Sequence, residues 1–227
     1  MYAIIRNNLV IGTTDELNYI KLQDNGCYGQ DKSSNPKGVA FMSVAYNILG
    51  TNGIGCPESV EIREVDEETL KQLPKFDYLG EAMDKKCVEL SAICNKTIID
   101  GIDYNGKHYS LTAADQTNID SMFNSIVLGA NSFPYHADGE ECAVMDAKSI
   151  TELYMAYKTH VTYHTTYFNM LKAQMKTYTE PNKVYGVQYG EELNDTFKAK
   201  MNEMLTAAQE QMNNIVNKLD GAFNVSK

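Results

Sequence analysis

The stretch 146–178, DAKSITELYMAYKTHVTYHTTYFNMLKAQMKTY, decides the fold of this chain. Apolar and aromatic residues recur in it at steps of four and three, which places them along one side of an α-helix. They are Ile150, Tyr154, Tyr157, Val161, His164, Phe168, Leu171, Met175 and Tyr178. The spacing therefore predicts a long helix over 146–178, ended by Pro181, whose wide aromatic stripe is buried against other parts of the protein.

A second long helix is predicted over 191–219, behind a glycine-containing connection at 182–190. Its apolar residues recur at a mean step close to that of a straight helix, which does not favour a supercoil. They form one face: Leu193, Phe197, Met201, Met204, Ala208, Met212, Ile215 and Leu219. Because a long helix with one apolar face is stable only when that face packs, we expect it to dock on its own domain, on a copy of itself or on a partner.

Upstream of the first long helix, helical spacing over 79–94 is followed by a β-hairpin pattern over 98–111. The pair Asn105-Gly106 is a strong two-residue turn signal, because both residues tolerate the positive φ that such a turn requires. This segment therefore predicts a helix that leads directly into a hairpin.

A further helix is predicted from Thr112 to about Leu128. The Thr112 hydroxyl can accept from the amide three residues on, and the Asp115 carboxylate favours the positive helix end. Gly129 is placed to stop this helix. A loop over 131–139 and a short strand over 142–145 then lead into the long helix.

Residues 1–75 are rich in short strand patterns separated by glycine and asparagine turns. Asn7-Asn8 joins two apolar runs as a hairpin, and a short helical turn starts at Asp66 and ends at Pro74. Further strands are expected over 17–22, 39–49 and 60–65. This pattern favours a small sandwich, barrel or meander.

Together these patterns predict an α+β fold in three parts. A small amino-terminal β-rich module covers 1–75, a mainly helical module with one β-hairpin covers 76–180, and a carboxy-terminal helix covers 181–227.

The composition excludes several classes of function. The apolar fraction of 43% is ordinary for a globular protein, and 20 basic against 30 acidic residues give a net charge of -10. Only Arg6 and Arg63 are arginines, so we expect no nucleic-acid partner. No run of 18 apolar residues occurs and the start lacks the pattern of a secretory signal, so we expect no membrane insertion.

The five cysteines are odd in number and contain no Cys-x-x-Cys pair. This disfavours a zinc ribbon or a thioredoxin-type site and indicates free thiols in a chain made in a reducing cytoplasm. The five are Cys27, Cys56, Cys87, Cys94 and Cys142.

His160 and His164 are four residues apart on the first long helix, a spacing that allows two imidazoles to share a metal ion. His136 or Cys142 could complete such a site. No glutamate separates the pair in the manner of zinc proteases, and His164 lies on the apolar stripe. A hydrogen-bonded packing role is therefore favoured, and no residue is assigned as a metal ligand. His108 is the fourth histidine.

No catalytic or cofactor-binding residue is assigned, and no cofactor is expected. The glycine-rich segment 50–55 lacks the lysine and hydroxyl of a phosphate loop, and Pro57 with a strand follows where a dinucleotide fold needs a helix. The segment 135–142 combines a histidine, acids and Cys142 without an oxyanion-hole motif. Fifteen tyrosines and no tryptophan are more informative, since tyrosine suits interfaces and carbohydrate stacking as well as core packing.

The stretch 101–111, GIDYNGKHYSL, followed by Asp115-Gln116-Thr117-Asn118, resembles a domain of unknown function found in phage and prophage tail genes. Segments 134–139 (PYHADG) and 164–169 (HTTYFN) are similar to its continuation in Firmicutes phages. Tyr2-Ala3-Ile4-Ile5 with 18–22 is similar to the start of clostridial tail-region proteins. The resemblance covers roughly 1–70 and 90–178 and does not reach the last helix.

This resemblance implies a structural, non-enzymatic component of a phage tail or tail-like particle, such as a tail fibre, baseplate or tail tip. Other tail proteins would be its partners, a homo-oligomer such as a trimer would fit, and a host-surface glycan is a further expected contact. The virion tail would be its location. An assembly chaperone that leaves the particle is the alternative, and a metal-dependent enzyme is a remote one. The family provides no catalytic residues to transfer.

Overall fold

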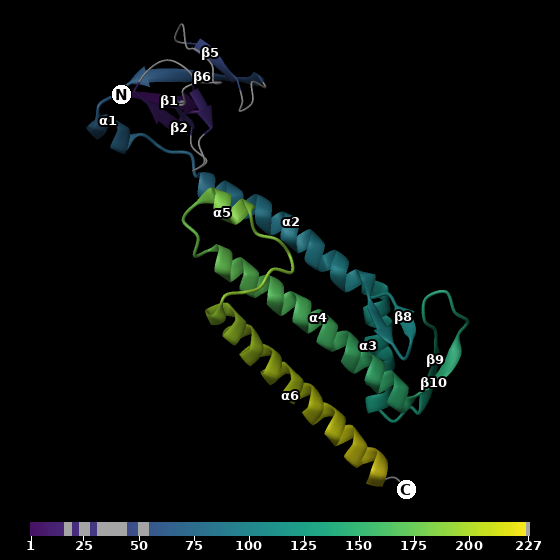
Figure 1. The fold of residues 1–227 in the computed structure, drawn as a ribbon. Helices are drawn as coiled ribbons and strands as arrows, with labels where there is room; N and C mark the ends of the chain where they lie inside the picture. The colour runs from purple at the N-terminus through teal and green to yellow at the C-terminus, as the bar shows by residue number, and fades with distance from the viewer. Residues whose placement is uncertain (16–19, 23–27, 31–44, 50–54, 226–227) are drawn as a thin grey trace. The chain divides into compact units, whose positions relative to one another are not determined.

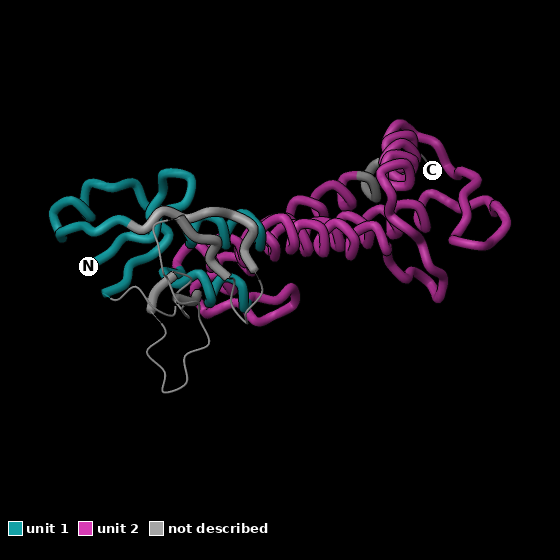
Figure 2. The backbone as a smooth tube through the Cα atoms, turned by 90° about the horizontal axis from the view of Figure 1, so that it is seen from above, with its two compact units in different colours: residues 1–86, 178–186 teal, residues 87–177, 187–227 magenta. Residues whose placement is uncertain are grey.

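The computed structural model of the 227-residue chain describes residues 1–15, 20–22, 28–30, 45–49 and 55–225. It is an α+β protein, as the sequence predicted. The chain forms two compact units, shown in Figure 2. Unit 1 consists of Met1–Lys86 with Tyr178–Gly186, and unit 2 consists of Cys87–Thr177 with Val187–Lys227. Each unit therefore combines segments that are distant in sequence.

Unit 1 contains one six-stranded sheet with the strand order β3-β4-β2-β1-β6-β5. Neighbouring strands are antiparallel except for β2 and β4, which are parallel. The described strands thus form a single open sheet, not a sandwich or a closed barrel. Their bounds are β1 Tyr2–Arg6, β2 Leu9–Thr14, β3 Ile20–Leu22, β4 Tyr28–Gln30, β5 Ala45–Leu49 and β6 Gly55–Glu64.

The predicted hairpin at Asn7-Asn8 is confirmed. Arg6 pairs with Leu9, and the two asparagines have φ values of 52° and 62°, as a tight two-residue hairpin turn requires. One apolar cluster is buried between the two strands of this hairpin, the residue that follows β6, and α1 (Glu67–Gln72) with the residue after it. That cluster consists of Ala3, Ile5, Val10 and Val65, with Leu70 and Leu73 packed against it.

The predicted helical turn before Pro74 is also confirmed, as α1. The Asp66 carboxylate accepts from the Thr69 amide at 2.7 Å and thereby caps the helix. Behind α1 the chain returns to β2, where the Val10 amide donates to the Pro74 carbonyl at 2.8 Å. The Tyr78 hydroxyl then donates to the Ile11 carbonyl at 2.7 Å, so the start of the next helix is tied to the sheet.

Several expectations for the amino-terminal part lie outside the described residues. Of the strand predicted over 17–22, only 20–22 are described, as β3, and of 39–49 only 45–49, as β5. The glycine-rich segment up to residue 54 and Cys27 also lie outside the described residues.

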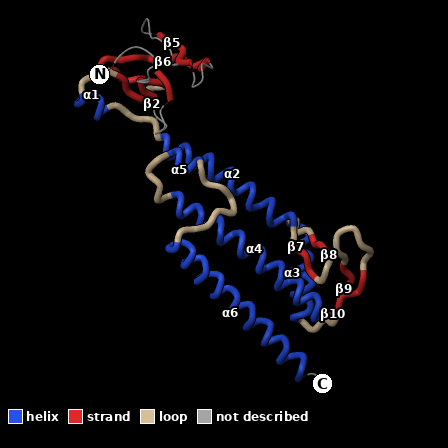
Figure 3. Tube along the Cα trace, in the orientation of Figure 1, coloured by secondary structure: helices blue, strands red, loops and turns tan. Residues whose placement is uncertain are grey.

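Unit 2 is built around α4 (Ala147–Met175), which packs against α6 (Asp195–Val225) and α3 (Ala113–Val127) (Figure 1). Two small hairpins lie beside the first half of α4, as Figure 3 shows. They are β7 (Ile102–Tyr104) with β8 (Lys107–Tyr109), and β9 (Ser132–Tyr135) with β10 (Ala143–Asp146). The core there contains Tyr109, Leu111, Ile119, Met122, Ile126, Ala137, Ile150, Leu153 and Tyr157.

The long helix predicted over 146–178 is confirmed as α4, with its start at the Asp146 cap and its end at Met175. Pro181 does not end it, because Pro181 occupies the first turn of a separate short helix, α5 (Pro181–Tyr185), where its missing amide costs nothing. The buried side of α4 also differs in part from the predicted stripe. Leu153, Tyr167 and Gln174 are buried, whereas Tyr154, Val161, His164 and Phe168 are only partly covered. Different elements cover the two halves of α4, so the buried side turns along its length.

The hairpin predicted over 98–111 is shorter in the structure, because Ile98-Ile99-Asp100 complete α2 (Tyr78–Asp100). Ile98 is buried one turn after Cys94, so packing extends the helix to this point. Gly101 then ends it with φ +96°, and the strands occupy 102–104 and 107–109. The loop predicted over 131–139 is also partly wrong, because β9 pairs with β10 there.

Both ends of α3 are confirmed. Thr112 and Asp115 form the reciprocal capping box, and Gly129 follows the helix with φ +101°. The last helix begins later than predicted, at Asp195, because the Asn194 side chain accepts from the amides of Thr196 and Phe197 and caps it there. Leu193 is therefore buried outside the helix.

We predict that Gly101→Ala destabilises the protein more than Gly129→Ala does. Both glycines have a positive φ, which costs an L-residue about 1–2 kcal/mol. A Cβ at Gly101 would lie 2.1 Å from the Tyr109 carbonyl oxygen, whereas a Cβ at Gly129 would meet nothing within 4 Å. Overpacking should add about 1–3 kcal/mol at Gly101 only. Urea unfolding measures both, and equal losses would contradict the packing argument.

Candidate functional site

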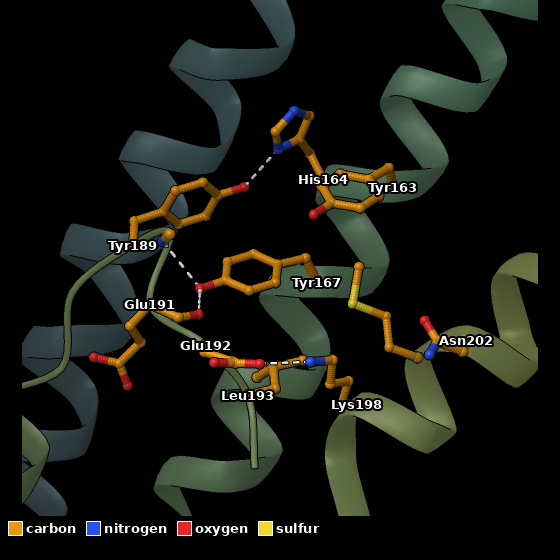
Figure 4. Close-up of a pocket in the computed structure, with 11 residues that line it drawn as sticks. Tyr163, His164, Tyr167, Tyr189, Glu191, Glu192, Leu193, Lys198 and Asn202 are labelled. Atoms are coloured by element: carbon orange, nitrogen blue, oxygen red, sulfur yellow. Dashed lines mark hydrogen bonds and ion pairs between the residues drawn. The ribbon is translucent and has the colours of Figure 1, made fainter. Parts of the chain in front are cut away.

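An open pocket of about 350 Å³ lies in unit 2 between α4, the segment 187–193 and the first turns of α6 (Figure 4). Aromatic side chains form most of its wall, and polar and charged groups stand at its edge. Its lining residues are Tyr163, His164, Tyr167, Tyr189, Gly190, Glu191, Glu192, Leu193, Lys198, Met201 and Asn202.

Three tyrosines make the aromatic wall. Tyr163 and Tyr167 are one helical turn apart on α4, and their rings are nearly parallel, with an interplanar angle of 6° and centroids 6.5 Å apart. Tyr189 meets Tyr167 edge to face, with centroids 5.2 Å apart and an interplanar angle of 83°. Tyr167 is buried, whereas Tyr163 is 45% exposed. The wall therefore has a covered inner ring and an accessible outer ring.

Hydrogen bonds hold Tyr167 in place. Its hydroxyl donates to the Glu191 carbonyl at 2.8 Å and accepts from the Gly190 amide at 2.9 Å. Gly190 has φ +96°, a backbone conformation that glycine adopts without strain, and it turns the chain toward the ring. Burial raises the pKa of Tyr167, so the phenol stays neutral. The inner ring is thus fixed before any ligand arrives.

Tyr189 is bonded to His164, since the His164 Nδ1 atom lies 3.1 Å from the Tyr189 hydroxyl (Figure 4). Burial, followed by a hydrogen bond with Cys94, raises the pKa of Tyr189. Burial, together with the nearby His160, lowers the pKa of His164. The neutral imidazole carries its proton on one of its two ring nitrogens, and this tautomer determines whether the phenol or Nδ1 donates in the bond.

The edge of the pocket carries both signs of charge. Glu192 and Lys198 form an ion pair at 2.5 Å, which lowers the pKa of Glu192 and raises that of Lys198. The Glu191 carboxylate accepts from the backbone amide of Gln188 at 2.9 Å. Asn202 adds an exposed amide, which can both donate and accept. The edge therefore offers a mixture of donors and acceptors.

The two histidines that could share a metal ion are held by other groups. Their ring centroids are 4.6 Å apart, His160 Nε2 lies 3.1 Å from the Thr97 carbonyl, and His164 Nδ1 is bonded to Tyr189. His136 bonds the Ala137 carbonyl, and Cys142 is an exposed free thiol. In the part of the chain that the structure describes, no three histidine, cysteine, aspartate or glutamate residues are arranged to hold a metal ion.

The residues of the hairpin and loop motifs are engaged in building the fold. His108 bonds Asp103 at 2.7 Å and the Asp100 carbonyl at 2.7 Å, and its own carbonyl accepts from the Asp138 amide at 2.9 Å. The Asp138 carboxylate in turn accepts from the Ser110 amide at 3.1 Å. These bonds join the β7–β8 hairpin to the loop behind β9.

Tyr135, the last residue of β9, stacks on Tyr109 with an interplanar angle of 9°. Burial raises the pKa of Tyr135 to about 12, so the phenol is neutral at physiological pH. The structure therefore gives the end of β9 a packing role, and the loop that follows contains the hydrogen-bonded Asp138.

A second polar cluster joins α3 to α4. The buried Tyr157 hydroxyl donates to Asp120 at 3.0 Å, and the Lys158 ammonium lies 2.9 Å from the same carboxylate. Because the three groups satisfy one another's hydrogen-bonding capacity, the cluster holds α3 and α4 together.

Sequence reasoning did not identify the pocket. Tyr163 and Tyr167 could have been noted as a tyrosine pair at helical spacing, since both lie in the predicted long helix. Tyr189, Lys198 and Asn202 join them only through the path of the connection and the packing of α6, which no local pattern shows.

Comparison with known proteins gives one family match. A family model described as a domain of unknown function, DUF4376, matches residues 81–189. No curated protein and no solved structure matches the chain significantly. The family match includes α3, α4 and both small hairpins, and it reaches the pocket only as far as Tyr189. Residues 81–189 are thus similar to this domain family, whose description names no activity.

We predict that His164 and His108 change the pH dependence of stability in opposite directions. The pKa of His164 is lowered, so its contribution is present above the unfolded value of 6.5 and is lost as the pH falls below it. Hydrogen bonds to Asp103 and Asp100 raise the pKa of His108, so its contribution is full below 6.5 and is lost as the pH rises. His164→Gln should therefore reduce the loss of stability between about pH 7.5 and 5.

His108→Gln is the matched control, and it should increase that loss. Urea unfolding of the wild type and both variants at the two pH values measures the difference. The carboxylates that contact neither histidine are common to all three proteins, so their effects cancel in the comparison. An unchanged pH dependence in His164→Gln would show that its imidazole titrates alike in the folded and unfolded chains.

Proposed function

We propose that this protein is a non-enzymatic, structural component of a phage tail or tail-like particle, made in the host cytoplasm and acting through its contacts. The resemblance of 101–118, 134–139 and 164–169 to a tail-region domain supports this function. The hydrogen bonds that the motif residues make within the hairpin and loop fit a family whose shared residues maintain an architecture.

The observation that carries the proposal is the surface of α6. Met201 on this helix is buried where α6 packs along α4, and Leu205, Ala208, Met212 and Val216 continue that side. Next to it Met204 is 52% exposed and Ile215 is 43% exposed. They are about three helical turns apart and so lie on the same side of the helix. We call Met204 and Ile215 the apolar edge of α6.

A second copy of the same helix is the occupant that we propose for this edge. Closed oligomers bury equivalent surfaces of identical chains, and a trimer fits the symmetry of phage appendages. Contacts with other tail proteins and with a host-surface glycan complete the proposal. Because the chain is acidic, the proposed function includes no binding to nucleic acid. Among the described residues no helix combines the length and apolar character of a membrane span.

An assembly chaperone for a tail fibre is the second candidate. The net charge of -10 and the methionines of α6 favour it, because an acidic surface keeps a complex soluble and methionine adapts to irregular apolar partners. The two candidates differ in whether the protein stays in the finished particle. A metal-dependent enzyme remains the remote alternative, for which the bonded His160 and His164 offer no support.

We predict that Met204→Lys with Ile215→Lys lowers the oligomeric mass of the purified protein. Two ammonium groups placed at the apolar edge would have to be desolvated in an interface, so the oligomer should dissociate. Multi-angle light scattering over a range of concentrations measures the mass. The matched control is Thr206→Lys with Asn217→Lys, which adds the same charge to exposed positions on the opposite side of α6. A wild type that is monomeric at every concentration would contradict self-association.

We predict that the protein is retained in mature particles. Gradient-purified particles should yield its peptides in a fixed ratio to tube and sheath peptides when analysed by mass spectrometry. The control is the same measurement on cell lysate, where the protein must be detected. Its presence in the lysate and absence from the particles would overturn the structural role and favour the chaperone.

A further inference from the structure

We propose that the tyrosine pocket of unit 2 binds a neutral saccharide, with the face of one sugar ring stacked on Tyr163. This inference rests on the proposed function, because it gives the expected glycan contact a site and a chemistry. The pocket of about 350 Å³ is at the lower end of the range for small-ligand sites, which suits one or two sugar rings.

The aromatic wall fits the apolar side of a sugar. A pyranose ring presents C–H groups on its face and hydroxyls around its rim, so it can cover an aromatic ring while its rim stays hydrated or hydrogen-bonded. Tyr163 is 45% exposed and lies beside Tyr167 with nearly parallel rings. A ring of this kind is apolar on its face and polar at one end, which suits a ligand of the same character.

The charges at the edge of the pocket select against ions. Glu191 and Glu192 disfavour phosphate, sulfate and acidic sugars. The Lys198 ammonium, 2.5 Å from Glu192, disfavours a quaternary ammonium ligand, which aromatic cages bind when only carboxylates surround them. A hydroxyl both donates and accepts, so the ion pair together with the Asn202 amide matches a neutral polyol best.

The pocket is organised before binding. Tyr167 is held by two hydrogen bonds and Tyr189 by one to His164, so these rings need not be ordered when a ligand enters (Figure 4). Ordering a side chain on binding costs conformational entropy and so weakens the binding. A weak ligand such as a single sugar ring gains from this saving.

The experiment uses the full chain labelled with ¹³C at its methionine methyl groups. Methyl β-glucoside, methyl β-galactoside and N-acetylglucosamine are titrated separately, with choline and glucose 6-phosphate as charged comparators. The expected result is that at least one neutral saccharide shifts the Met201 methyl resonance, which reports from the pocket, and leaves that of Met122 in the α3 core unchanged. Saturation transfer should then be strongest at the C–H groups of one ring face.

The stacking partner is tested by substitution. Tyr163→Ala should weaken the binding at least tenfold, and Tyr163→Phe should retain it, because the ring face remains. Tyr185→Ala is the matched control, since Tyr185 is 41% exposed and is not part of the pocket lining. Asn202→Ala, an exposed substitution at the rim, provides a second variant if Tyr163→Ala does not fold.

Three results would overturn the proposal: no neutral saccharide shifts Met201, choline or glucose 6-phosphate shifts it instead, or Tyr163→Ala binds as the wild type does. These outcomes concern the pocket alone. Absence of the protein from purified particles, seen by mass spectrometry, would not contradict saccharide binding. A titration without binding would not contradict its presence in the particle. The two proposals can therefore fail separately.

Discussion

The apolar side chains of α4 must be buried along its whole length, and the other elements of unit 2 pack around this helix. With 29 residues, α4 is about 44 Å long, and the 15 residues of α3 reach only about half as far. α3 and the two hairpins therefore bury Ile150, Leu153 and Tyr157. α6 packs on α4, and the connection before it is bonded to Tyr167 and Gln174 in the second half, where Tyr167, Leu171 and Met175 are buried.

Burial of these six side chains outweighs the polar contacts on the surface of α4. Each fully buried apolar side chain contributes about 1.5–3 kcal/mol. The surface pair Lys148–Glu152 has side chains 84% and 48% exposed, and pairs of this kind contribute about 0–1 kcal/mol. The packing of unit 2 around α4 is thus determined mainly by apolar burial, and the pocket lies where the connection passes from α4 to α6.

Some side chains of unit 2 maintain the fold, and others are exposed and can contact a partner. Asp138, His108 and the Asp120–Tyr157–Lys158 cluster are satisfied inside unit 2 and join neighbouring elements. The ring of Tyr163, the amide of Asn202 and the apolar edge of α6 face solvent. Structural roles and candidate contacts therefore occupy different residues, which allows the contacts to be altered by mutation without removing the bonds that hold the unit together.

Local signals in the sequence were sufficient to determine the α+β class, the hairpin at Asn7-Asn8, the capped start of α3 and the existence of α4, because each depends on residues a few positions apart. Tertiary packing decided what these signals do not contain. Compared with the helices predicted from the sequence, α2 continues through Ile98 and α6 begins later, after the Asn194 cap. Packing also places Tyr167 on the buried side of α4. It also brought Tyr189 and Lys198 to Tyr163. The pocket depends on contacts between segments more than twenty residues apart, and such contacts leave no periodic pattern in the chain.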